Sequence, residues 1–262
     1  MINRIAAAIL LGGIQGIAEW LPISSSGHLA LIQISLGLSA PVAFDALLHL
    51  ATLLVAAAKF RGDLASILGN WLKLDLGSPP AKLGLMVLVG NVPTLLLGLA
   101  LRDAFEAMYS DPRAIGFAFL LTGSLLYASR RGGEGGKAIG HREAILIGLS
   151  QGLSIAPGAS RSGLTIATAL LLGVERREAV RFSFLLMMPA VLGALALETG
   201  RSSAADMGPL EALAGFSAAL AIGYLSLGLL IRSVSKGRFH LFSYYCWFVG
   251  AIALAHSLAS LA

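Results

Sequence analysis

The sequence predicts an all-α polytopic membrane protein, with six full transmembrane helices and two re-entrant helical hairpins in an inverted-topology repeat. Three observations predict this class. Of the 262 residues, 56% are hydrophobic and only 13% are charged, against about 25% charged in an ordinary soluble domain. The apolar residues form runs long enough to cross a bilayer. Two further apolar runs are interrupted by clusters of proline, glycine and serine that carry ionisable residues.

The composition excludes several other classes of protein. A chain with this share of apolar residues is not intrinsically disordered. Cys246 is the only cysteine, which excludes an intrachain disulfide and a metal site built from a cysteine cluster. A net charge of +5 is compatible with a protein that binds nucleic acid, but such binding needs basic residues gathered on one polar face. Here they fall between apolar runs, so we expect membrane lipids and no nucleic acid as partners.

Six apolar stretches have the length of membrane spans, because a hydrocarbon core of about 30 Å needs roughly 17–25 residues of helix. Charged residues bound each stretch, as Lys59 and Arg61 bound the first. The predicted spans are about 42–58, 83–101, 114–129, 182–197, 212–231 and 241–260.

The intervals 5–37 and 142–174 are predicted to enter the membrane and return. Each splits into two apolar pieces around a cluster, 21–28 in the first and 157–163 in the second, which we call the first and second tip. The piece after each tip has about a dozen residues, or about 18 Å of helix, which is too short to cross. Irregular backbone is tolerated at membrane depth only where protein buries it or it lines a wet cavity.

The basic residues predict the orientation of the chain. If the hairpins do not cross and the six spans alternate, 14 of the 19 Lys and Arg residues fall on one side and 4 on the other. The positive-inside rule places the richer side in the cytoplasm and both termini outside a cell (inner or plasma) membrane. Arg161 belongs to neither set.

The two tips align in an internal repeat with an offset of 136 residues. The seven identical pairs in positions 15–37 are Gln15/Gln151, Gly16/Gly152, Ser24/Ser160, Ser26/Ser162, Gly27/Gly163, Leu36/Leu172 and Gly37/Gly173. Three spans follow each hairpin, so the hairpins enter from opposite faces. We expect one membrane domain, 1–262, with inverted repeats of about 1–130 and 131–262, an arrangement that places binding sites near the midplane.

A duplication without function is the alternative, with small residues present only for close packing. That account does not explain ionisable residues at the tips, which are costly at membrane depth. Arg161 can bind a phosphate bidentately beside a helix N-terminus that attracts anions. The second tip is thus predicted to cradle an oxyanion, with further contributions from Gly158, Ser160, Ser162 and Gly163. A structural ion pair between Arg161 and Glu19 is the competing interpretation, and the two are compatible.

The first tip carries candidates for catalysis. Ser24, Ser25 and Ser26 precede His28, which is close enough on a helix start for contact with Ser25. A serine nucleophile needs such a base. Ser25 aligns with Arg161 in the repeat, so a pseudo-two-fold axis brings them together.

Two further pairs of polar residues are four positions apart in the sequence. Gln15 and Glu19 share one helix face, and Glu19 is a candidate ligand for a divalent cation, Mg or Ca, whose other ligands are water and phosphate. Asp45 and His49 are also four apart. This pair fits a cavity wall and a polar pair at a membrane end equally well.

The chain resembles the undecaprenyl-diphosphate phosphatase (bacitracin-resistance) family over essentially its whole length. Two motifs carry the resemblance, the first tip together with Gln15 and Glu19, and the second tip. Shorter similar stretches are 44–49 and 182–186.

The resemblance implies hydrolysis of a polyprenyl diphosphate to its monophosphate, which recycles the lipid carrier of cell-wall glycans. It also implies bacitracin resistance and dependence on a divalent cation, and a homodimer is compatible with it. By position, Glu19, Ser25, His28 and Arg161 match the family's important residues, with Gln15 where many members have Glu. Gln15, Ser24, Ser26 and Gln151 complete the expected substrate-binding set.

These residues lead to one hypothesis and one alternative. In the hypothesis, Ser25, or a water activated by His28, attacks the terminal phosphorus while Arg161 and a cation neutralise the diphosphate. The alternative is a transporter or flippase for polyprenyl phosphate or another anionic lipid, since inverted repeats with broken helices are typical of transporters. A purely structural scaffold is disfavoured by Arg161 and Glu19 at the tips.

Overall fold

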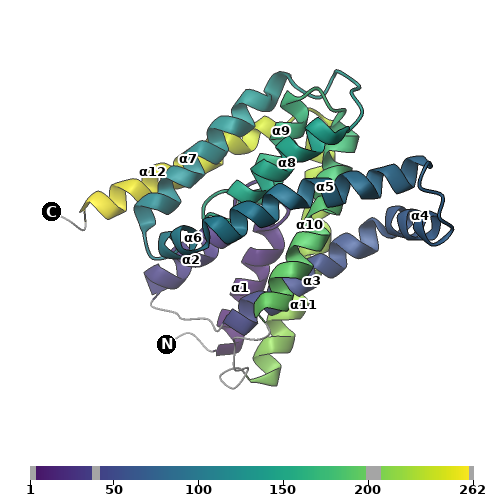
Figure 1. The fold of residues 1–262 in the computed structure, drawn as a ribbon. Helices are drawn as coiled ribbons and strands as arrows, with labels where there is room; N and C mark the ends of the chain where they lie inside the picture. Colours follow the sequence, from purple (N-terminus) through teal and green to yellow (C-terminus); the bar gives the residue numbers. More distant parts are fainter. Residues whose placement is uncertain (1–3, 37–41, 199–207, 260–262) are drawn as a thin grey trace.

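The computed structural model describes residues 4–36, 42–198 and 208–259, in which the regular elements are helical apart from an isolated β-bridge between Lys137 and Val174 (Figure 1). The predicted all-α class is confirmed. Gly37, Arg201 and the end of the predicted span 241–260 lie outside these ranges. The α-helices of the described ranges are α1 (Arg4–Ala18), α2 (Ser25–Leu36), α3 (Val42–Lys59), α4 (Arg61–Leu72), α5 (Pro79–Ala100), α6 (Arg102–Met108), α7 (Pro112–Ala128), α8 (His141–Leu153), α9 (Arg161–Leu171), α10 (Arg176–Glu198), α11 (Pro209–Ser235) and α12 (Phe242–Ala259).

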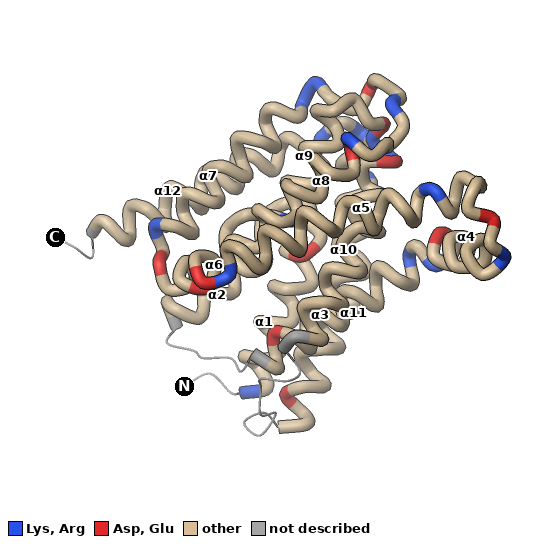
Figure 2. The backbone as a smooth tube through the Cα atoms, viewed as in Figure 1, with Lys and Arg blue, Asp and Glu red and all other residues tan. Residues whose placement is uncertain are grey.

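The six predicted spans coincide with α3, α5, α7, α10, α11 and α12. In the described residues, four helical segments are long and apolar enough to cross a membrane: Pro79–Ala100, Arg176–Ala196, Pro209–Ser235 and Phe239–Leu258. A bent pair, α3 with α4, makes a fifth if it is counted as one span. The chain is therefore a multi-pass helical membrane protein. Lys and Arg gather near the ends of the long helices (Figure 2).

Both predicted hairpins contain a helix, a break and a shorter helix. In the first, α1 is followed by turns and by the 12-residue α2; in the second, α8 leads through 154–160 to the 11-residue α9. The predicted lengths of the second pieces are thus confirmed. The break in each predicted hairpin is largely buried. In the first, Trp20 is fully buried and packs edge-on against Phe184 of α10 at 5.1 Å between ring centroids.

The first helix of each predicted hairpin packs closely against a long apolar helix through facing glycines. A Cβ atom at Gly12 of α1 would lie 2.2 Å from the carbonyl oxygen of Gly215 in α11. A Cβ atom at Gly148 of α8 would lie 1.9 Å from the carbonyl oxygen of Gly90 in α5. Only glycine allows backbones to approach this closely. These contacts position α1 and α8, and with them the tips.

Two helices were not predicted from the sequence. Helix α4 follows a 75° bend after α3 and packs on α5, where the Trp71 Nε1 donates to the carbonyl of Ala81 at 3.2 Å. The Arg181 Nη2 of α10 also donates to the Asp63 Oδ1 at 2.6 Å. Helix α6 is a short connection before α7. The charges of 59–63 mark the end of the first apolar run, but they carry no information about the chain folding back.

Candidate functional site

The two tips contact each other directly. The Ser24 Oγ accepts hydrogen bonds from the backbone N–H groups of Gly27 at 3.2 Å and Gly158 at 3.1 Å. Thr122 of α7 supports the second tip, since its Oγ1 donates to the Gly158 carbonyl at 3.3 Å and accepts from the Ser160 N–H at 3.2 Å. Gly27 and Gly158 lie so close that a Cβ atom at Gly27 would be 2.7 Å from the Gly158 Cα. The tips therefore pack against each other in backbone contact.

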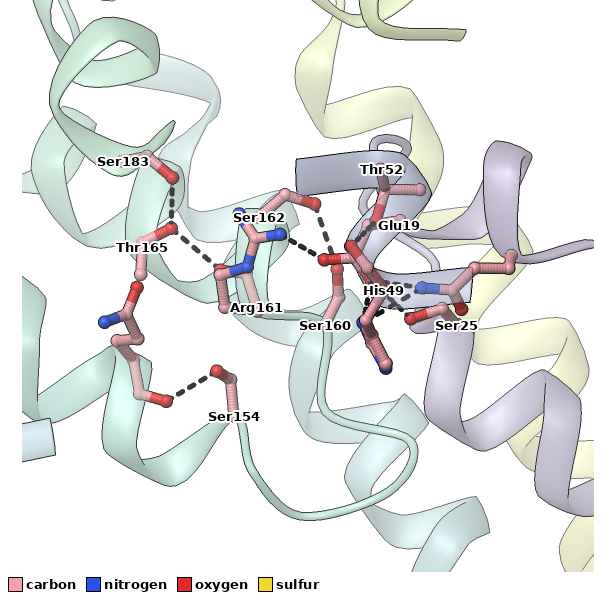
Figure 3. Close-up of polar contacts among 12 residues, drawn as sticks. Glu19, Ser25, His49, Thr52, Ser154, Ser160, Arg161, Ser162, Thr165 and Ser183 are labelled. Carbon is pink, nitrogen blue, oxygen red and sulfur yellow. Dashed lines mark hydrogen bonds and ion pairs between the residues drawn. The ribbon is translucent and has the colours of Figure 1, made fainter. Parts of the chain in front are cut away.

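An ion pair joins the predicted residues of the two tips. The Arg161 Nη2 donates to the Glu19 Oε1, and the side chains are only 14% and 7% exposed (Figure 3). The other carboxylate oxygen, Oε2, accepts from the Ser25 Oγ at 2.8 Å and from the Gln15 Nε2 at 3.2 Å. The structural ion pair considered from the sequence is present. It places Ser25 and Arg161 on the two oxygens of one carboxylate.

Arg161 is the first residue of α9, and the local sequence caps this helix. The Ser160 Oγ accepts from the Gly163 N–H at 3.1 Å and lies 3.3 Å from the Ser162 Oγ. The Arg161 Nη1 is buried and has no hydrogen-bond partner among the described residues. A guanidinium with a free donor at a helix N-terminus is suited to an oxyanion, in keeping with the predicted cradle.

The predicted contact between Ser25 and His28 is wrong. Ser25 turns toward Glu19, whereas the His28 Nδ1 lies 2.8 Å from the Ser24 carbonyl oxygen and its Nε2 lies 2.7 Å from the Tyr245 hydroxyl of α12. The imidazole also stacks on the Tyr245 ring, with 5.7 Å between centroids. Both ring nitrogens are engaged, because the first turn of α2 directs the two side chains to different neighbours. His28 does not line the cavity described below.

His49 is the histidine beside the ion pair. Its Nδ1 lies 3.1 Å from the Gln15 Nε2 and 3.8 Å from the Glu19 Oε2 (Figure 3). The sequence left two interpretations of Asp45 and His49, a cavity wall or a polar pair at a membrane end. The first is confirmed for His49, which lines the cavity described below. The spacing within α3 reveals which residues share a face but not that α3 packs beside α1.

The ion pair opens into a cavity of about 640 Å³. Of the predicted site residues, its walls contain Glu19, Ser24, Ser25, Ser26, Gln151, Ser160 and Arg161. Gln15, Gly158, Ser162 and Gly163 are absent from the walls and support the residues that form them. The apolar part of the wall comes mainly from α5 and α10, with Leu88, Val92, Leu95, Leu99, Ala190, Ala194 and Leu195.

The cavity wall contains a second polar group, and the sequence predicted only one of its members, Gln151. The Gln151 Nε2 donates to the Asn91 Oδ1 at 3.4 Å and to the Thr94 Oγ1 at 3.3 Å. All three residues line the cavity. An asparagine inside an apolar span was the available signal, because a buried amide at membrane depth needs partners.

The donor set restricts the kind of metal that the site could hold. Within the described ranges, no group of three or more His, Cys, Asp or Glu residues is close enough for a metal ion. Glu19 is the only carboxylate on the cavity wall, and the neighbouring Gln15 Oε1 is buried without a hydrogen-bond partner. Two oxygen donors fit a hard cation whose remaining ligands are phosphate oxygens and water.

Known proteins resemble the chain over nearly its full length. The family model described as bacitracin resistance protein BacA matches residues 8–252. A relative from Korarchaeum cryptofilum named undecaprenyl-diphosphatase is 42% identical over 260 residues, covering 96% of this chain and 99% of the relative. Relatives of the same name from Methanosphaera stadtmanae and Carboxydothermus hydrogenoformans are 36% and 38% identical, covering 97% and 94% of this chain and 98% and 95% of their own lengths.

Proposed function

This chain belongs to the bacitracin resistance protein BacA family and is an undecaprenyl-diphosphatase, and we propose that the cavity at the hairpin tips is its active site. The reaction hydrolyses undecaprenyl diphosphate to the monophosphate and inorganic phosphate, which recycles the lipid carrier. One observation carries the proposal for the site. A buried arginine with an unpartnered Nη1, a serine hydroxyl and a carboxylate meet on one wall of a cavity that is otherwise largely apolar.

Arg161 binds the diphosphate. Its free Nη1 and the N-terminus of α9 attract a phosphate oxygen, and the capping serine Ser160 holds the helix start in place. Preorganised donors of this kind stabilise the charge that develops as the phosphoryl group is transferred. The apolar wall from α5 and α10 directs the prenyl chain toward lipid.

Ser25 is the nucleophile in this proposal, and Glu19 is its base. The Ser25 Oγ already donates to the Glu19 Oε2 at 2.8 Å. As the Oγ bonds to the terminal phosphorus, its proton passes to Glu19, the bridging P–O bond breaks, and the lipid monophosphate leaves. Water then attacks the phosphoserine, releases inorganic phosphate and restores Ser25. In a route by direct water attack, Glu19 would take the proton of the water, because His28 is engaged elsewhere.

We assign the divalent cation, Mg or Ca, to Glu19 and the Gln15 Oε1. Glu19 lines the cavity, and the neighbouring Gln15, which supports the wall, has an Oε1 without a hydrogen-bond partner among the described residues. When bound, the cation neutralises phosphate oxygens next to Arg161. The protein's own residues hold the diphosphate and move the proton.

The finer topology is part of the proposal: six spans, two re-entrant hairpins from opposite faces, and extracytoplasmic termini. The equivalent close approaches at Gly12 and Gly148, 136 residues apart, support the repeat. Cys246→Ser removes the only native cysteine. Glu106→Cys in that background should then react with an impermeant maleimide outside the cell, whereas Glu134→Cys should not; the reverse pattern would invert the orientation.

Phosphate release from undecaprenyl diphosphate in detergent tests the site. The wild-type protein should release phosphate, and Ser25→Ala and Arg161→Ala should each lose almost all activity, with exposed Ser235→Ala as the control. Retained activity in Ser25→Ala would transfer the nucleophilic role to water. The alternative, a lipid transporter, predicts no phosphate release at all without a membrane gradient.

A further inference from the structure

The contacts of Gln15 determine which nitrogen of His49 carries a proton. The Gln15 side chain is completely buried, and its Nε2 lies 3.2 Å from the Glu19 Oε2 and 3.1 Å from the His49 Nδ1. A carboxylate oxygen only accepts hydrogen bonds, so the amide must turn its NH₂ group toward Glu19. The same NH₂ group then donates to the His49 Nδ1, which must be the acceptor. In a neutral imidazole with an accepting Nδ1, the proton is on Nε2.

The Nε2 of His49 is free to meet a ligand. The side chain lines the cavity and is 35% exposed, and no described residue forms a hydrogen bond with Nε2. The His49 ring lies beside Glu19 at the cavity (Figure 3). The charged groups of the neighbouring elements that face this region are Glu19 and Arg161, the pair at which a phosphate binds.

We propose that His49 is a substrate-binding residue whose Nε2–H donates a hydrogen bond to a phosphate oxygen of the lipid diphosphate. Gln15 is the positioning residue that keeps the proton on that nitrogen. The inference rests on the proposed function, because it takes the cavity as the phosphate site. It also separates the roles of neighbouring groups: Glu19 accepts the proton of Ser25, and His49 supplies a neutral donor beside the charged Arg161.

Kinetics with three variants test the contact. A hydrogen bond to a charged group contributes about 1.5–3 kcal/mol, so His49→Ala should lower kcat/KM for undecaprenyl diphosphate about 10- to 100-fold, mainly through KM. His49→Gln keeps an amide N–H on a side chain of similar reach and should recover most of the loss. His256→Ala, near the end of α12, is the control. A kcat/KM for His49→Ala within twofold of the wild-type value would overturn the proposal.

The tautomer gives a readout that does not depend on activity. With ¹⁵N-labelled histidine, the His49 signals are assigned by their loss in His49→Gln. We expect a protonated Nε2 and an unprotonated Nδ1 in the wild-type protein, loss of this preference in Gln15→Leu, and a shift of the Nε2 signal on addition of inorganic phosphate. A proton on Nδ1, or an unchanged Nε2 signal with phosphate, would contradict the inference. Absence of phosphate release by the wild-type protein would instead count against the proposed function.

Discussion

The Ser24 hydroxyl accepts the backbone N–H of Gly158 at 3.1 Å, although the two residues are 134 positions apart in the chain. The same oxygen accepts the N–H of Gly27, and the Ser24 carbonyl pairs with His28. One residue thus joins the two tips, and Ser25, which follows it, is directed to Glu19. The distance between the nucleophile and Arg161 depends on this junction.

Gly27→Ala should separate the tips. Its Cβ would lie 2.7 Å from both the N and Cα of Gly158, which are backbone atoms and cannot turn away. Overpacking of this kind costs about 1–3 kcal/mol, and a misplacement of about 1 Å at an active site costs about 100-fold in rate. Phosphate release and thermal unfolding in detergent measure the two effects. Gly228→Ala in α11, where the new methyl group meets open space, should match the wild-type protein; equal losses in both variants would contradict the account.

Arg161→Lys should lose activity although the charge is kept. Lysine cannot contact Glu19 and a phosphate with two nitrogens of one planar group. Loss of one charge-assisted hydrogen bond, about 2 kcal/mol, corresponds to about 30-fold in kcat/KM. The matched control is Arg102→Lys, an exposed residue paired with Glu106 at 2.7 Å. Near-normal turnover of the lipid diphosphate by Arg161→Lys would remove Arg161 from the proposed site.

Removal of divalent cations with a chelator should abolish most phosphate release, and added Mg or Ca should restore it in a saturable way. Glu19→Asp keeps the carboxylate but shortens its reach, so this variant should need about tenfold more cation for half-maximal activity. The control is Glu134→Gln, an exposed carboxylate, whose requirement should be unchanged. Full activity in the presence of the chelator would exclude the cation from the reaction.

Glu143 should make the stability of α8 depend on pH. The hydrogen bond from Lys137 holds the pKa of the Glu143 carboxyl below its usual range, and the two atoms Nζ and Oε1 are 2.7 Å apart. A lowered pKa in the folded state stabilises the protein above the ordinary glutamate pKa of about 4.3, and this stabilisation is lost as the pH falls through the folded value. Glu143→Gln should therefore cost about 1 kcal/mol at pH 7.

The measurement is thermal unfolding in detergent at pH 7 and at pH 3 to 4. The difference between the wild-type protein and Glu143→Gln should shrink toward the lower pH, as the Glu143 carboxyl takes up a proton. The control is Glu106→Gln, an exposed residue whose effect should be small throughout. A difference that grows at low pH would show that the Lys137 contact does not stabilise the ionised form.

Much of the fold and of the ion pair was predictable from the sequence. Long apolar runs bounded by charges predict helices wherever they occur, and α2 and α9 have the predicted shortness. Glu19 and Arg161 were conspicuous because a charge inside an apolar segment is costly unless it is paired. These inferences depend on composition and on neighbours along the chain.

The features that could not be predicted depend on contacts between distant elements. His28 is near Ser25 in sequence, but α12 supplies Tyr245 as its partner; His49 is 24 positions from Ser25 and lies beside Glu19 because α3 packs against α1. The bend between α3 and α4 is held by contacts with α5 and α10. Spacing within one helix does not reveal which neighbour a side chain meets.

The pairing of Glu19 with Arg161 also gives the site a means of selecting its ligand. The carboxylate is attached to the same chain, so its effective concentration at the guanidinium exceeds that of most dissolved anions. A monovalent anion such as chloride must compete with this tethered group and brings no more charge than it does. A diphosphate brings several charges and oxygens, so it can bind the unpartnered Nη1 of Arg161 while Nη2 stays on Glu19. We therefore expect the site to favour a multiply charged anion over a monovalent one.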